Sequence, residues 1–330
     1  MSNSILDRAI SRRSAIGAGL GVLATLGLAA CGSSEAPAPA AASGSASTDA
    51  TTGDTSVKID KTAYDELVNA GPVADDAAVA ASAWATKVKG EGKLRVGGVQ
   101  TSTLFSLLDE TDGKVRGFDA GLSQLVSRYI LGEVNVELTQ VTSDTRESVL
   151  QNDQVDSVFG TYSINDKRKQ LVSFAGPYYY TQQSILVLAD NSDINGPDDL
   201  KGKTVAVQSG STGPDIVKEV APEATQQEFK TDEEARQALQ QGRVDAYVID
   251  TNMQLGSMTK NPGKYRLAGD PFGPTDNYGI GLPKDSDGVA FVNDFLKKIE
   301  DDGTWAKLWK ICIGDRAGIE TVPEPPAIGA

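Results

Sequence analysis

The 330-residue sequence contains no histidine and only two cysteines, Cys31 and Cys312. Without histidine, neither His-dependent acid–base catalysis nor a His-ligated metal site is possible. If Cys31 is modified as described below, Cys312 has no partner for an intramolecular disulfide. Its apolar neighbours predict a buried structural thiol, with a reactive thiol as the less favoured reading. We therefore expect no disulfide framework, no metal and no cofactor.

Basic residues are also scarce. The chain has 31 Lys and Arg against 45 Asp and Glu, which gives a formal charge of −14. A surface this acidic repels phosphate groups, so nucleic acid and anionic head groups are excluded as expected partners.

No apolar run is long enough to predict a transmembrane helix with confidence. Residues 15–30 are uncharged and rich in Ala, Gly and Leu, and three arginines precede them, which is typical of a signal peptide over residues 1–30. The run ends in Leu28-Ala29-Ala30-Cys31, which resembles the lipobox of bacterial lipoproteins. We expect Cys31 to carry a diacylglycerol, the alternative being an ordinary thiol near a cleavage site. Ser11-Arg12-Arg13-Ser14 resembles a twin-arginine signal, so both export routes stay open.

Bulky side chains are almost absent from residues 32–56, which consist of Gly, Ala, Ser, Thr and Pro apart from Glu35, Asp49 and Asp54. Such a composition buries too little apolar surface to fold. We expect residues 31–56 to be a disordered tether that reaches roughly 27 Å as a flexible coil.

The remainder is long enough for two lobes. Residues 57–92 are predicted to form a helical extension in two pieces, broken at Gly71-Pro72, and residues 315–330 a C-terminal tail. From residue 93, β-rich runs alternate with amphipathic helical stretches, which predicts an α/β fold with parallel strands and right-handed crossovers. The predicted strands are 94–97, 134–141, 156–160, 184–189, 203–207, 244–249 and 278–282, and the predicted helices are 119–130, 144–151, 213–220, 232–241, 289–299 and 305–311.

Three segments share one geometry, in which a strand ends, a polar loop follows and a helix begins. Ligands of open α/β sheets bind at such strand ends, where helix N-termini and free backbone groups face them. In the first segment, Gly160 to Arg168, hydroxyls of Thr161 and Ser163 precede a helix that carries Arg168. A guanidinium matches a carboxylate, although a solvated arginine in a charged run is an equally good reading.

The second segment runs from Val207 to Pro214. Gly210 frees the backbone for close approach, and the amides and hydroxyls of Ser211 and Thr212 are predicted to face an anion. A simple helix cap is the default reading of such a turn, and no lysine follows it as in a nucleotide-binding loop.

The third segment is Asp250, directly after the strand 244–249. A carboxylate at the end of a buried strand is costly unless a cation pairs with it, although it could also cap the next helix. Together the three segments present a cation and hydroxyls opposite a single carboxylate. This arrangement is complementary to a zwitterion, with the α-carboxylate on Arg168 and Thr212 and the α-ammonium on Asp250.

With these segments in place, residues 93–314 resemble the family 3 extracellular solute-binding proteins of ABC-type amino-acid importers. The resemblance is carried by motifs in a specific order and spacing: Lys114 to Asp119, Thr161 to Arg168, Phe174 to Tyr179, Asp199 to Lys203, Gln208 to Thr212, Gly242 to Ala246 and Asp301 to Thr304. Residues 161–164 are further similar to the glutamate-binding branch of high-GC Gram-positive bacteria. The chain departs from the family pattern at Gly121, where a second acidic residue is usual, and around Ser102, where an aromatic often covers the ligand.

The resemblance implies a type II periplasmic-binding-protein fold with two Rossmann-like lobes joined by two crossover strands. Lobe 1 is expected over residues 93–182 and 279–314 and lobe 2 over residues 183–278, with hinges at 180–184 and 277–281. The implied ligand-binding residues are Gly160, Thr161, Ser163, Arg168, Gly210, Thr212 and Asp250.

The expected function is binding without chemistry, by a monomeric, lipid-anchored protein on the extracytoplasmic face of the cell membrane. Its expected partners are a free amino acid (glutamate, glutamine or aspartate favoured), an ABC permease and, through Cys31, the lipid bilayer. Two alternatives are an enzyme on the same scaffold, such as a dehydratase, for which Asp250 is the candidate acid or base, and a sensory ectodomain.

Overall fold

The computed structural model describes residues 58–329. The predicted signal peptide over residues 1–30, the lipidated Cys31 and the tether over residues 31–56 lie outside the described residues.

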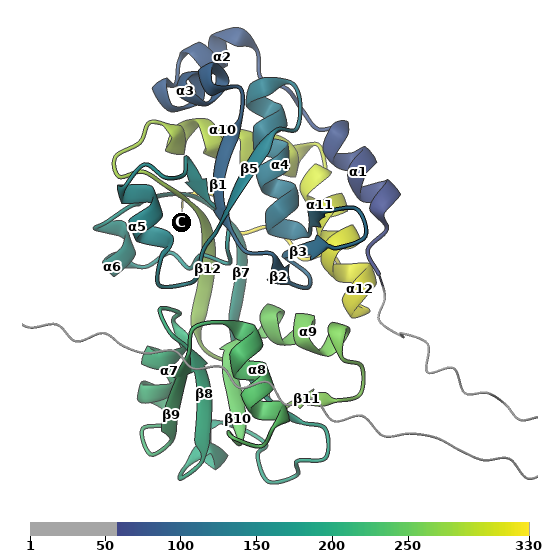
Figure 1. The fold of residues 1–330 in the computed structure, drawn as a ribbon, viewed down its shortest axis with the longest axis vertical. Coiled ribbons are helices and arrows are strands. Elements are labelled where there is room, and N and C mark those ends of the chain that lie inside the picture. The colour runs from purple at the N-terminus through teal and green to yellow at the C-terminus, as the bar shows by residue number, and fades with distance from the viewer. Residues whose placement is uncertain (1–57, 330) are drawn as a thin grey trace, which may run out of the picture. The chain divides into compact units, whose positions relative to one another are not determined.

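The main sheet runs in the order β5-β1-β6-β12-β7-β10-β8-β9, with β11 also paired to β7 (Figure 1). Its strands are β1 Leu94–Gly98, β5 Val136–Gln140, β6 Ser157–Val158, β7 Ser173–Leu188, β8 Thr204–Gln208, β9 Thr225–Phe229, β10 Ala246–Asp250, β11 Tyr265–Leu267 and β12 Phe272–Leu282. A second sheet joins β2 Thr101–Ser102, β3 Ser106–Asp109 and β4 Lys114–Arg116.

Two long antiparallel strands, β7 and β12, lie at the centre of the main sheet and pair through registers such as Tyr278 opposite Tyr179. On one side β1 runs parallel to β5 and β6, and on the other β8 runs parallel to β9 and β10. The predicted α/β architecture with two crossover strands is confirmed. The prediction of a strand over 184–189 was too short, because β7 begins at Ser173 and contains Gly176-Pro177, a dipeptide that usually indicates a turn.

Helices flank these strands close to their predicted positions. The helices beyond the extension are α4 Phe118–Leu131, α5 Arg146–Gln151, α6 Asp166–Lys169, α7 Gly213–Val220, α8 Asp232–Gln240, α9 Thr251–Lys260, α10 Gly288–Asp301, α11 Thr304–Trp309 and α12 Asp315–Ala317, with a 3₁₀ turn Pro197–Leu200 and a π-helical turn Lys310–Gly314. Cys312, within the π-helical turn, is fully buried, as predicted.

The extension forms three helices, not two: α1 Lys61–Asn69, α2 Asp76–Ala80 and α3 Ala83–Glu91. The break that the sequence reading missed lies at Ser82, whose hydroxyl accepts a hydrogen bond from the Ala85 amide and caps α3. An N-capping serine inside an alanine-rich run was the available signal, because its side chain competes for the backbone hydrogen bonds of a continuing helix.

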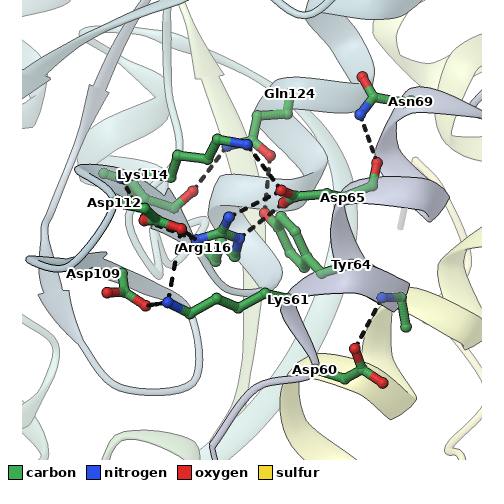
Figure 2. A network of polar contacts seen from close by, with 12 residues as sticks. Asp60, Lys61, Tyr64, Asp65, Asn69, Asp109, Asp112, Lys114, Arg116 and Gln124 are labelled. Carbon is green, nitrogen blue, oxygen red and sulfur yellow. Dashed lines mark hydrogen bonds and ion pairs between the residues drawn. The ribbon is translucent and has the colours of Figure 1, made fainter.

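Helix α1 is fastened to β4 and α4 by the polar network of Figure 2. The buried Arg116 guanidinium contacts both carboxylate oxygens of Asp65, at 2.8 and 2.9 Å. A side chain at Gly121 of α4 would clash with Leu308 of α11 and meet the Tyr64 hydroxyl of α1. The absence of an acidic residue at position 121 therefore goes with the close packing of α1.

The predicted tail also packs on the body. Ile319, Val322 and Ile328 lie against the largest core cluster, and the Arg316 guanidinium donates to the Thr103 carbonyl.

Candidate functional site

The three predicted segments all follow strand ends of the main sheet. The first follows β6 and leads into α6, the second follows β8 and leads into α7, and the third is the last residue of β10, directly before α9. The second segment also contacts residues near α5, because the Ser209 hydroxyl donates to the Asp144 carboxylate at 2.5 Å. The structure therefore brings loops from both halves of the sheet together.

Arg168 is buried, with 6% of its surface exposed, so the reading of a solvated arginine is wrong. Asn165 caps α6 and accepts a hydrogen bond from the Arg168 amide at 2.9 Å. The guanidinium donates to the carbonyls of Ser163 at 2.7 Å and Gly210 at 2.8 Å. Because Gly210 belongs to the β8–α7 loop, this one side chain joins two of the predicted segments.

A second buried arginine, Arg146 of α5, faces the same place and was missed by the sequence reading. Its guanidinium donates to the Gly160 carbonyl at 2.9 Å and to the Gly210 carbonyl at 3.4 Å. Arg146 and Arg168 lie over one ring, with guanidinium carbons 4.3 and 5.1 Å from the Tyr162 centroid. Burial and the neighbouring Arg168 charge lower the pKa of Arg146 to about 10. Two positive charges that are both shielded from water favour the binding of an anion beside them.

The backbone of Thr161 adopts a left-handed conformation, with φ 45°, which is uncommon for a threonine. Its amide donates to the buried carboxylate of Asp119 at 2.8 Å, and the same carboxylate accepts from the Tyr178 hydroxyl at 2.7 Å. Burial raises the pKa of Asp119 to about 6. Asp119 thus holds the strained turn that presents the Gly160 and Thr161 carbonyls to Arg146.

Asp250 is 5% exposed and does not cap α9 with its side chain. Its carboxylate accepts hydrogen bonds from the Gln183 amide and from the Tyr278 hydroxyl, the latter at 2.6 Å. Both donors are neutral side chains of the crossover strands β7 and β12. The carboxylate is therefore held by uncharged groups and not by the cation that its burial led us to expect. Burial and, next, the charge of Asp276 raise the pKa of Asp250 to about 7.

A chain of hydrogen bonds connects Asp250 with the surroundings of Arg168. The Gln183 amide that holds Asp250 also lies 3.3 Å from the Thr212 hydroxyl, which in turn donates to the Asp276 carboxylate at 2.8 Å. Gln183 and Asp276 were not predicted because they lie inside the long antiparallel strands β7 and β12, whereas the three predicted segments follow strand ends. The Ser211 hydroxyl accepts from the Gly213 amide at 3.1 Å and is part of the turn itself.

The predicted residues surround two cavities rather than one. Arg168, Gly210 and Thr212 line a cavity of about 620 Å³ together with Asp276. Gly160 and Thr161 line a smaller space of about 50 Å³ together with Arg146. Ser163 and Asp250 line neither and are both buried; the Ser163 carbonyl accepts from Arg168, and the Asp250 carboxylate accepts from Gln183. The Gly210 carbonyl, which both guanidiniums contact, lies where the two sets of residues meet.

Across residues 58–329, no group of three Asp, Glu or Cys side chains is placed to hold a metal ion. No helix of that region combines the length and the apolar character needed to cross a bilayer.

Residues 94–314 match the model of a protein family described as bacterial extracellular solute-binding proteins, family 3. The ABC transporter glutamine-binding protein GlnH of Bacillus subtilis is 37% identical over 218 residues, which cover 64% of this chain and 78% of GlnH. The glutamate-binding protein GluB of Corynebacterium glutamicum is 34% identical over 221 residues, covering 63% of this chain and 74% of GluB.

A solved structure of an ancestral arginine-binding protein bound to glutamine matches the fold with a TM-score of 0.63. It is 36% identical and covers 68% of this chain and 98% of that protein. The helical extension before residue 94 and the tail after residue 314 lie outside the family match.

Proposed function

Because this chain belongs to the bacterial extracellular solute-binding proteins of family 3, which have the type II periplasmic-binding fold, we propose that it binds a free amino acid between two lobes and delivers it to an ABC permease. Lobe 1 is residues 93–182 with 279–314, and lobe 2 is residues 183–278. The hinge segments 180–184 and 277–281 lie in the paired strands β7 and β12, where a small change in strand twist moves one lobe against the other.

The observation that carries this proposal is the separation of charge at the contact between the lobes. Two buried guanidiniums, Arg146 and Arg168, lie on the lobe 1 side, and the buried carboxylate of Asp250 lies on the lobe 2 side. A zwitterion that places its α-carboxylate on Arg168 and its α-ammonium on Asp250 contacts both lobes at once. It therefore stabilises only the closed form.

The binding free energy follows from the number of such bonds. Two or three charge-assisted hydrogen bonds contribute about 1.5–3 kcal/mol each. Only the upper end of their sum, about 9 kcal/mol, leaves room for the cost of closing and still reaches micromolar affinity, near about −8 kcal/mol.

The ligands that we favour are glutamate, glutamine and aspartate, in keeping with the glutamine- and glutamate-binding relatives. The second guanidinium, Arg146, favours glutamate and aspartate. It is buried, and among the described residues its hydrogen-bond partners are backbone carbonyls and not carboxylates. In a direct comparison of affinities, glutamate and aspartate are therefore expected to bind more tightly than glutamine.

We further infer that Cys31 is lipidated and that residues 31–56 tether a monomeric body to the outer face of the membrane. The support is the sequence Leu28-Ala29-Ala30-Cys31 and the composition after it. Replacing Cys31 by serine is expected to release the protein from the membrane fraction and to abolish incorporation of labelled palmitate. Size-exclusion chromatography with light scattering tests the monomeric state of the body.

A thermal-shift screen of the twenty amino acids, followed by calorimetry on the hits, tests the main proposal. We expect a rise in melting temperature with one or more of L-glutamate, L-glutamine and L-aspartate. If none of the twenty amino acids shifts the melting temperature or gives binding heat, the proposal is wrong.

One observation favours an enzyme as the second candidate function. A buried carboxylate with a pKa of about 7, such as Asp250, has the property that a general acid or base needs near neutral pH. Chromatography of each binding amino acid after prolonged incubation distinguishes the two functions, since a binding protein returns the ligand unchanged.

A further inference from the structure

We propose that Asp276 is a built-in competitor of the ligand, because its carboxylate accepts a hydrogen bond from the Thr212 hydroxyl, one of the groups predicted to bind the ligand's α-carboxylate, in the cavity that Arg168 also lines. This inference rests on the proposed function. It adds a residue that sets affinity and selects for ligand charge, and it assigns a role to an acid that the sequence reading did not single out.

Asp276 lies in β12, at the hinge side of the cleft. It pairs with Thr181 of β7, directly after an irregularity in the strand register that begins at Phe272. Only 7% of its surface is exposed, and it lines the 620 Å³ cavity together with Arg168 and Thr212. A carboxylate in this position is desolvated, so it requires donors from the protein.

The side chain that donates to it is a predicted ligand-binding group. The Thr212 hydroxyl donates to Asp276 Oδ2 at 2.8 Å. Burial raises the pKa of Asp276, while the Thr212 hydrogen bond and the nearby charges of Arg168 and Arg146 act in the opposite direction. Thr212 and Arg168 are two residues assigned to the ligand; both line the same cavity as this carboxylate, and Thr212 donates to it directly.

A second carboxylate entering the same set of donors meets electrostatic repulsion, because two like charges a few ångströms apart disfavour joint ionisation. Binding of an amino acid therefore requires Asp276 to give up Thr212 or to take up a proton. Both requirements lower the affinity. The penalty is larger for a ligand with a second carboxylate, so Asp276 also reduces the preference for L-glutamate over L-glutamine that Arg146 creates.

The opposite role for Asp276 is a second contact to the ligand's ammonium beside Asp250. The two roles predict opposite effects of removing the charge, since a competitor weakens binding and an ammonium ligand strengthens it. The sign of the change in affinity therefore decides between them.

The test is calorimetry of Asp276→Asn with L-glutamate and with L-glutamine, beside the unaltered protein. We expect at least about tenfold tighter binding, equivalent to about 1.4 kcal/mol, with a larger gain for L-glutamate. Asp215→Asn is the matched control. Asp215 lines the same cavity, but 80% of its side chain is exposed and it pairs with Lys167 at 3.3 Å, so loss of its charge is expected to change affinity by less than about twofold.

Thermal melting without ligand checks that each variant is folded, and Asp276→Ser serves as a smaller neutral replacement if Asp276→Asn is not. Unchanged or weaker binding by the folded variants overturns the inference, as does an equal gain in Asp215→Asn. If the unaltered protein binds neither probe nor any other amino acid, it is the proposed function that fails.

Discussion

Replacing Arg168 by methionine tests the predicted α-carboxylate site with little change in side-chain volume. The arginine makes hydrogen bonds of 2.7 and 2.8 Å to two backbone carbonyls, and its Nε lies 3.4 Å from Glu147. Truncating one partner of a buried, hydrogen-bonded charge pair costs about 2–5 kcal/mol. The dissociation constant of the amino acid is therefore expected to rise by roughly 30- to 5,000-fold.

The same substitution affects stability, because it removes the guanidinium from two buried carbonyl contacts. We expect a loss of about 1–3 kcal/mol in the free energy of unfolding, measured by urea denaturation without ligand. Affinity is measured separately by isothermal titration calorimetry at a temperature where the variant is folded. The two readouts separate a binding role from a structural one.

Arg116→Met is the matched control for Arg168→Met. Arg116 is equally buried, with 4% of its side chain exposed, and it pairs with Asp65 in the network of Figure 2. It shares no partner with the candidate site, so the control is expected to lose comparable stability and to keep its affinity within about twofold. Unchanged affinity in Arg168→Met, or an equal loss in both variants, would refute the assignment of Arg168 to the ligand.

Three further predictions concern Asp250 and Asp65. Asp250→Asn is expected to abolish amino-acid binding. Because the pKa of Asp250 is raised in the folded protein, its ionisation lowers stability as the pH rises from about 4 through about 7. The variant is therefore also expected to melt at a higher temperature than the unliganded parent at pH 8, and a lower melting temperature contradicts this interpretation. At pH 6, where Asp250 is protonated in the free protein, binding an ammonium group is expected to release up to one proton from Asp250, and affinity is expected to fall toward acid by up to about tenfold per pH unit. Calorimetry in two buffers of different ionisation enthalpy measures the net release. An absence of release both in the unaltered protein and in Asp276→Asn, where Asp276 cannot take up a proton, rules out Asp250 as the ammonium partner. Asp65→Ala leaves buried Arg116 donors unsatisfied and is expected to lower stability by about 1–3 kcal/mol in urea denaturation, while a changed ligand affinity argues against a purely structural extension.

The sequence predicts most regular elements of the fold because alternating strands and amphipathic helices leave strong periodic patterns. The helix Gly213–Val220, for example, agrees with its predicted bounds, and its start is indicated by Gly210 and Pro214. The long crossover strand β7 was recognised only near its end. Its first half contains Gly176-Pro177, and a strand that is buried through tertiary pairing overrides such local turn signals.

Parts of the candidate site were predictable for a different reason. Strand ends in an α/β sheet meet at one edge, so Arg168, Thr212 and Asp250 were expected near one another, and the structure links them through Gly210, Gln183 and Asp276. The linking residues were not predictable, because their placement depends on how β7 and β12 pair and on the contact between the lobes. Arg146 was missed as an ordinary arginine in a helix, since nothing in the local sequence indicates that its side chain is buried.

The most direct test of the account compares L-glutamate with two analogues by calorimetry. Glutarate lacks the α-ammonium group and 4-aminobutanoate lacks the α-carboxylate, and both keep the rest of the molecule. If opposite charges on the two lobes hold a zwitterion, L-glutamate binds and both analogues bind at least about 100-fold more weakly. Binding of glutarate or 4-aminobutanoate with an affinity near that of L-glutamate would contradict the pairing of Arg168 and Asp250 across the ligand.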